Sequence, residues 1–284
     1  MRWQQGRRST NIENRQRLGG KTVAGGGIGF LVLALIVGLM GGDPAPLLRE
    51  GIERTVESHI SKNSGLSEEQ IKESSEFVSV VLGSTEDVWN TEFRSVGQSY
   101  SDPTLVLFTG RVSSACGYAT AASGPFYCPT DQKIYIDLSF YNDLKNDLNA
   151  PGDFAQAYVI AHEVGHHVQN LMGVIPKINA LKAKSSEKIA NQLSVRVELQ
   201  ADCLSGIWAR RVQDEYNMIE EGDIEEALNA ASQIGDDRLQ KQSQGYVVPD
   251  SFTHGSSAQR ERWFRTGFNA DDIDSCNTFD VERI

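Results

Sequence analysis

The stretch Phe154–Leu171, FAQAYVIAHEVGHHVQNL, restricts the fold and the chemistry of this chain more than any other. Apolar residues recur on nearly every side of a helix built through it, so we expect a buried helix with Asp153 as its N-cap. His162 and His166 are four residues apart, slightly more than one helical turn, so both imidazoles project from one face. Two histidines and a glutamate inside a buried helix need a partner, because unpaired polar burial is costly.

The HExxH spacing at 162–166 is typical of zinc sites. Two imidazoles one turn apart can take two corners of a zinc tetrahedron, at about 2.0–2.1 Å from the metal. Glu163 lies about 100° round the helix from His162, too far round to bind the metal but well placed to activate a metal-bound water. We therefore predict that His162 and His166 hold Zn²⁺ and that Glu163 is the general base.

A catalytic zinc also needs a third protein ligand and one open position. We assign this role to Glu198, on a helix expected over about 186–217, because the gap after the histidines leaves room for a loop and an antiparallel return. Glu187, His254 and other acids are the alternatives. Asp202 lies one turn after Glu198 and could accept the second N–H of a ligating histidine, which would fix the orientation of that ring.

The rest of the chain contains helical and strand-like patterns. Helical periodicity covers about 47–96, with a capping box at Ser67 and Gln70 and a separate helix from residue 86. Short β-rich runs predict strands at 104–109, 126–127 and 133–137. Later helices are expected at about 153–171, 186–217, 223–242 and 256–268. Helices before and after a small sheet indicate a mostly helical α+β domain.

The charge of the chain is divided unevenly. Residues 1–21 carry six basic side chains and one acid, a net charge of +5, whereas the remainder has a net charge of −16. An acidic body repels phosphate backbones, so we expect no nucleic-acid partner.

Residues 22–42 contain no charged side chain and are long enough, at roughly 30 Å as a helix, to cross a bilayer. We predict one N-terminal transmembrane helix at 22–42, a basic cytoplasmic tail at 1–21 and a zinc metallopeptidase domain at 43–284 outside the cytoplasm, following the positive-inside rule. The protein would be a single-pass protein of the cell inner (cytoplasmic) membrane. A cleaved signal peptide is the alternative.

The four cysteines are even in number, and none forms a CxxC pair, which fits an oxidising compartment. Four cysteines allow three pairings. Cys116–Cys128 would close a short loop and is the simplest bridge, and Cys203–Cys276 follows by elimination. Buried free thiols are the alternative.

HExxH with a downstream ExxxD resembles the gluzincin arrangement of thermolysin-like peptidases, in which the later Glu binds zinc and the Asp supports a ligating His. The whole chain resembles the bacterial neutral zinc metallopeptidase family with an N-terminal membrane anchor. This resemblance implies a zincin-like peptidase domain. It rests on the basic tail before the anchor and on the stretches CGYA at 116–119, GPFYCP at 124–129, IYID at 134–137, HEVGHHVQ at 162–169, ELQADC at 198–203 and THGSSAQR at 253–260.

The remaining histidines differ in what they suggest. The gluzincin resemblance implies that a later histidine donates a hydrogen bond to the oxyanion, and His254 could do so, with Tyr246 or Arg260 as substitutes. His254 could equally stabilise its turn. His167 points off the metal face, so we interpret it as a packing or hydrogen-bonding residue, and His59 has no functional interpretation.

The predicted function is zinc-dependent hydrolysis of peptide bonds in a peptide or protein substrate, with Glu163 and His254 as catalytic residues. The strand at 104–109 could offer its edge to an extended peptide. One alternative is a zinc-binding envelope protein without proteolytic turnover, with an interaction or structural role. Another is a metal-dependent hydrolase of a cell-wall amide.

Overall fold

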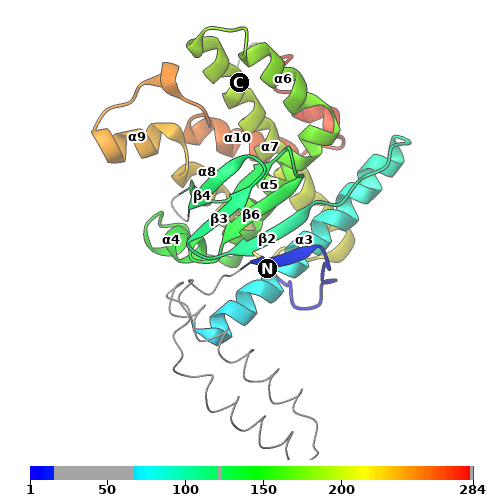
Figure 1. Ribbon diagram of the computed structural model, residues 1–284. Helices are drawn as coiled ribbons and strands as arrows, with labels where there is room; N and C mark the ends of the chain where they lie inside the picture. The colour runs from blue at the N-terminus through cyan, green and yellow to red at the C-terminus, as the bar shows by residue number, and fades with distance from the viewer. Residues whose placement is uncertain (16–66, 121–122, 282–283) are drawn as a thin grey trace, which may run out of the picture.

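The computed structural model describes residues 1–15, 67–120, 123–281 and 284. Over these residues the chain is mostly helical with two small sheets, as expected for the α+β class (Figure 1). In chain order the elements are β1 (Ile12–Arg15), α3 (Glu68–Ser95), β2 (Thr104–Phe108), β3 (Arg111–Ser114), β4 (Gly117–Thr120), β5 (Phe126–Cys128), β6 (Lys133–Asp137), α4 (Phe140–Asn146), α5 (Asp153–Leu171), α6 (Val174–Lys182), α7 (Glu187–Tyr216), α8 (Asp223–Gln233), α9 (Asp236–Gln244), the 3₁₀ turn η2 (Pro249–Ser251), α10 (Ser257–Phe268) and the 3₁₀ turn η3 (Ile273–Cys276).

The main sheet has the strand order β1-β2-β6-β5. The first three strands are parallel, and β5 is antiparallel to β6. Residues Leu105–Phe108 of β2 are all buried, which is typical of a parallel strand covered on both faces. The expectation that 104–109 offers a free edge is therefore wrong, because β2 lies between β1 and β6. The edge strand on the other side of the sheet is β5.

The N-terminal segment folds with the domain. β1 pairs with β2 in register, from Ile12 opposite Leu105 onward, and Figure 1 shows this segment beside β2 and α3. The Met1 side chain is buried, and its ammonium lies 2.8 Å from the Asp153 carboxylate at the start of α5. Residues 1–15 therefore do not form the separate tail that the sequence suggests. They pack with residues 67–120 and 123–281 in one folded body.

The predicted membrane helix at 22–42 lies outside the described residues. In the part of the chain that is described, no helix is both long and apolar enough to cross a bilayer. The predicted arrangement of a cytoplasmic tail at 1–21 and an external domain at 43–284 depends on the predicted helix at 22–42 and therefore stays a prediction.

The helices differ from the sequence expectations mainly at their boundaries. The helix predicted to start at residue 86 is part of α3, which is continuous from its predicted capping box at Ser67. The N-cap of α5 is Gly152 and not Asp153, and the carboxylate of Glu226 accepts a hydrogen bond from the backbone N–H of Phe154 instead. The helix predicted over 223–242 is divided at Ile234 and Gly235 into α8 and α9.

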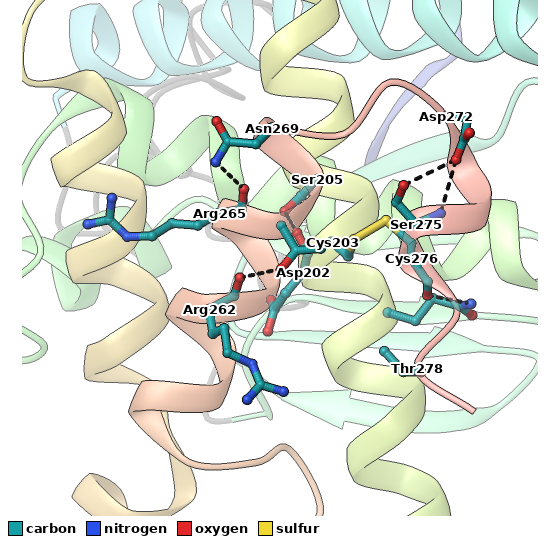
Figure 2. The surroundings of a disulfide bond; sticks show 12 residues. Asp202, Cys203, Ser205, Arg262, Arg265, Asn269, Asp272, Ser275, Cys276 and Thr278 are labelled. Atoms are coloured by element: carbon teal, nitrogen blue, oxygen red, sulfur yellow. Dashed lines mark hydrogen bonds between the residues drawn. A yellow bond between two sulfur atoms is a disulfide. The ribbon is translucent and has the colours of Figure 1, made fainter. Parts of the chain in front are cut away.

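Both predicted disulfides are present. Cys203–Cys276 joins α7 to η3 beside Asp202, as Figure 2 shows, and lies in the fully buried core. Cys116–Cys128 joins the turn between β3 and β4 to the end of β5. The first bridge holds the C-terminal segment against a central helix. The second ties the turn of the small hairpin to the end of β5, and Val112 of this hairpin packs against Val106 and Phe108 on a face of the main sheet.

Candidate metal centre

Helices α5 and α7 pack against each other and bring the three predicted zinc ligands together. The Nε2 atoms of His162 and His166 lie 3.2 and 3.5 Å from the same carboxylate oxygen of Glu198. A methyl group at Gly165 would lie 3.0 Å from the backbone oxygen of Ala201, so a glycine between the two histidines allows this close helix approach. The potential ligand atoms all lie within 4.8 Å of one another.

The donor set and its orientation fit a catalytic zinc ion. Two imidazole nitrogens and one carboxylate oxygen are a recognised combination for such sites, which leaves a fourth position open. Both imidazoles direct Nε2 towards Glu198 because their Nδ1 atoms are held elsewhere. Nδ1 of His162 lies 2.8 Å from Asp202 Oδ1, and Nδ1 of His166 lies 2.9 Å from Gln169 Oε1. Asp202 therefore lies where the sequence predicts it.

Gln169 is a residue that the sequence analysis did not identify. It is fully buried, and its amide nitrogen donates hydrogen bonds to the backbone oxygen of Val197, at 2.8 Å, and to Gln200 Oε1, at 2.9 Å. These contacts fix its amide with the oxygen facing His166. Its spacing, three residues after His166 on the same helix, is the signal that could have indicated the contact.

A buried ion pair lies behind His162. Arg260 on α10 donates from Nε to Asp202 Oδ2 and from Nη2 to Asp202 Oδ1, each at 2.9 Å. The hydroxyl of Tyr158 also donates to Asp202 Oδ1, at 2.5 Å. Burial alone would raise the pKa of Asp202, but Arg260 and His162 outweigh it and lower that pKa to about 2. Arg260 thus holds Asp202 as a carboxylate, and its guanidinium is committed to that contact.

The three candidate ligands influence one another's charge. Burial lowers the pKa of His162, but the carboxylates of Asp202 and Glu198 outweigh burial and raise it to about 9. Burial would raise the pKa of Glu198, yet the two histidines hold it well below its usual range. The imidazoles and the Glu198 carboxylate therefore each favour the charged form of the other.

Glu163 lines the same cavity as the three candidate ligands, and the cavity volume is about 480 Å³. Its side chain is buried, and burial raises the pKa of its carboxyl group. Within the described part of the chain, no hydrogen bond ties up this carboxylate. A buried carboxylate with a raised pKa and open oxygens suits proton transfer.

Of the three residues considered for oxyanion binding, His254 alone remains suitable. It lines the cavity, its side chain is 52% exposed, and its Nδ1 lies 3.2 Å from Asp236 Oδ1, which leaves Nε2 available. The hydrogen bond to Asp236 raises the pKa of His254. Tyr246 is 62% exposed and does not line this cavity, and Arg260 is held by Asp202.

The other acids and histidines have no place in the cluster. Glu187 is exposed at the start of α7, about 16 Å along the helix from Glu198. His167 is fully buried, with Nδ1 3.0 Å from the hydroxyl of Tyr127 and Nε2 2.6 Å from the backbone oxygen of Ser101. The hydrogen-bonding role expected for His167 is thus confirmed. His59 lies outside the described residues.

Comparison with known proteins agrees with this site. The family described as "Putative neutral zinc metallopeptidase" matches residues 1–279. Uncharacterized protein YpfJ of Escherichia coli (strain K12) is 48% identical over 289 residues, which cover 98% of this chain and 99% of YpfJ. Uncharacterized protein Rv2575 of Mycobacterium tuberculosis (strain H37Rv) is 37% identical over 252 residues, which cover 85% and 84%. No solved structure matches. The chain therefore belongs to the neutral zinc metallopeptidase family.

Proposed function

We propose that this protein is a zinc-dependent peptidase in which His162, His166 and Glu198 hold the metal and Glu163 is the general base. The observation that supports this most is the convergence of two Nε2 atoms and one carboxylate oxygen, with Glu163 lining the same cavity. Zinc held in this way would supply a Lewis acid that makes water acidic near neutral pH.

Different side chains of the protein would carry out proton transfer, orientation of the imidazoles and oxyanion binding. Glu163 removes a proton from the attacking water and passes it to the leaving amine. Asp202 and Gln169 keep the two imidazoles turned with Nε2 towards Glu198. His254, with Nδ1 held by Asp236, donates from Nε2 to the oxyanion of the tetrahedral intermediate.

The substrate in this proposal is an extended segment of a peptide or protein. Phe126 and Tyr127 belong to the edge strand β5, and both line the cavity. A peptide that adds to this edge by main-chain hydrogen bonds would run beside the metal cluster. This proposal replaces the earlier expectation for β2, which has neighbours on both sides.

We further propose that the folded body lies outside the cytoplasm. The two disulfides support this location, because such bonds persist in oxidising compartments. Residues 22–42 would attach the protein to the cytoplasmic membrane. Since β1 pairs with β2, residues 1–15 and the rest of the folded body would be on the same side of that membrane.

The test uses the full chain loaded with zinc, and it measures both metal content and cleavage of denatured casein. Glu163→Gln should keep one zinc per chain and lose at least about a hundredfold in kcat/KM. Glu198→Ala should lose the metal, whereas Glu187→Gln, an exposed acid on the same helix, should change neither quantity. Full zinc occupancy in Glu198→Ala would overturn the ligand assignment.

The main alternative is a zinc-binding envelope protein without turnover. It predicts stoichiometric zinc in the wild-type protein and no cleavage of casein. Peptidoglycan fragments assayed in parallel would identify a hydrolase of cell-wall amides, which would cleave those fragments and leave casein intact.

A further inference from the structure

Two buried glutamines connect His166 to the C-terminal segment of the chain. Gln200 on α7 donates from Nε2 to the backbone oxygen of Cys276, at 3.0 Å, and its Oε1 accepts a hydrogen bond from Nε2 of Gln169, at 2.9 Å. Gln169 Oε1 in turn lies 2.9 Å from Nδ1 of His166. The two glutamines are 0% and 7% exposed, so their hydrogen bonds are shielded from water. The candidate metal centre is thus linked to the backbone of η3.

The hydrogen bonds in this series can run in one direction only. The backbone oxygen of Cys276 can only accept, so Gln200 must turn its amide nitrogen to that oxygen and its amide oxygen to Gln169. Gln169 must then turn its amide nitrogen to Gln200 and its amide oxygen to His166, an orientation that the backbone oxygen of Val197 also favours. An amide oxygen at Nδ1 requires a proton there. In the neutral imidazole this leaves the lone pair on Nε2, the nitrogen that faces Glu198.

The C-terminal end of the series is anchored to the same helix. The disulfide Cys203–Cys276, drawn in Figure 2, joins η3 to α7, and both of its cysteines are fully buried. Two residues later, the hydroxyl of Thr278 donates to the backbone oxygen of Arg196 on α7, at 2.6 Å. The disulfide and this hydrogen bond together determine where the Cys276 oxygen lies, and therefore how Gln200 is oriented.

We propose that Gln200 is a positioning residue for the zinc site, which transmits the position of the disulfide-anchored segment to the ring of His166 through Gln169. This inference rests on the ligand assignment in the proposed function. It goes beyond that assignment because the zinc affinity would depend on Gln200 and on the Cys203–Cys276 bond. Within the described residues, neither the Gln200 side chain nor this bond makes a printed contact with a candidate ligand.

The first measurement is the zinc affinity of single variants. The full chain is stripped of metal, circular dichroism confirms that it is folded, and zinc is titrated at neutral pH in competition with a chromogenic chelator. Gln169→Met, which removes the contact with His166, should weaken zinc binding by about 10-fold to 100-fold. Gln200→Met should weaken it by at least about threefold, since Gln169 keeps its bond to Val197. Gln192 is an exposed glutamine on the same helix, so Gln192→Met is the matched control and should bind zinc like wild type.

A double variant distinguishes positioning from a general loss of stability. If Gln200 acts through Gln169, the variant Gln169→Met, Gln200→Met should bind zinc as tightly as Gln169→Met alone, within about twofold. If the two single effects multiplied instead, Gln200 would act independently of Gln169 and the inference would be overturned. Wild-type affinity in Gln200→Met would overturn it as well.

The disulfide is tested by the same comparison. The variant Cys203→Ala, Cys276→Ala should weaken zinc binding by at least about threefold in the wild-type background and should have no further effect in the Gln169→Met background. Removal of the other bridge, in Cys116→Ala, Cys128→Ala, should leave the zinc affinity unchanged. Equal affinities in the two disulfide variants would overturn the role of the Cys203–Cys276 anchor. If the first of them does not fold, the glutamine variants still decide the inference.

These measurements require no turnover, which separates the inference from the proposed function. A protein that shows the expected zinc affinities but cleaves no peptide would contradict the peptidase proposal and support the role of Gln200. Wild-type affinity in Gln200→Met, together with loss of zinc in Glu198→Ala, would overturn the role of Gln200 and leave the ligand assignment intact.

Discussion

Replacement of Asp202 by asparagine tests the buried ion pair behind the metal centre. The side chains of Asp202 and Arg260 are 0% and 3% exposed, so the substitution would leave a guanidinium charge inside the protein without a counterion. Removal of one partner from a buried ion pair costs about 3–5 kcal/mol. Urea unfolding of the metal-free full chain, followed by circular dichroism, measures this change in the free energy of unfolding.

The same helix provides a matched control. Asp214 on α7 forms an exposed ion pair with Arg210, so Asp214→Asn should cost less than about 1 kcal/mol. If Asp202→Asn also lowered the free energy of unfolding by less than about 1 kcal/mol, the reasoning would be refuted. The guanidinium of Arg260 would then be hydrated as readily as that of the exposed Arg210.

The stability effect can be separated from the effect on the metal. The double variant Asp202→Leu, Arg260→Met removes both charges and should recover most of the lost stability. It cannot supply the acceptor for Nδ1 of His162, so its zinc affinity should remain about 10-fold to 100-fold below wild type. Recovery of zinc affinity together with stability would mean that Asp202 does not orient His162.

Three further predictions follow from the site and from the N-terminal segment. Gly165→Val should cost about 1–3 kcal/mol of stability by urea unfolding and should weaken zinc binding, because the added carbons push α5 away from α7. If His254 donates to the oxyanion, kcat/KM should fall as the pH rises through the pKa of His254, which Asp236 raises above its usual value. The variant His254→Ala should lose this fall in kcat/KM at high pH. Cysteines introduced at the exposed positions Gln4 and Lys241 should react with an impermeant maleimide from the same side of the membrane. All four native cysteines are in disulfides and should not be labelled. Labelling of only one of the two positions in intact cells would contradict their place in one folded body.

The candidate metal ligands were predictable because their signal is local. His162 and His166 share a face of one helix. Glu198 and Asp202 are also four residues apart in a helical pattern, so they share a face of a second helix. The close approach of α5 to α7 then leaves few other positions for an acid beside the two histidines. Periodicity and capping signals likewise located α7 and α10 within a residue or two.

The parts that the sequence could not indicate depend on tertiary packing. Nothing in the pattern around Arg260 shows that its guanidinium, which also lines the cavity, is held by the Asp202 carboxylate. β1 is a four-residue strand with Glu13 and Asn14 at its centre, too short and too polar to be recognised, and its partner β2 lies about ninety residues later. The basic residues near it suggested a membrane-side tail, yet Arg7 is paired with Glu86 on α3.

The position of β1 has a practical consequence for work with shortened forms of this protein. A fragment that begins after the uncharged stretch would lack the strand that covers β2, and would therefore expose the backbone donors and acceptors along Leu105–Phe108. An uncovered strand of four apolar residues is a template for pairing with another copy. Such fragments should self-associate during expression and refolding, even though every residue of the proposed metal centre would still be present.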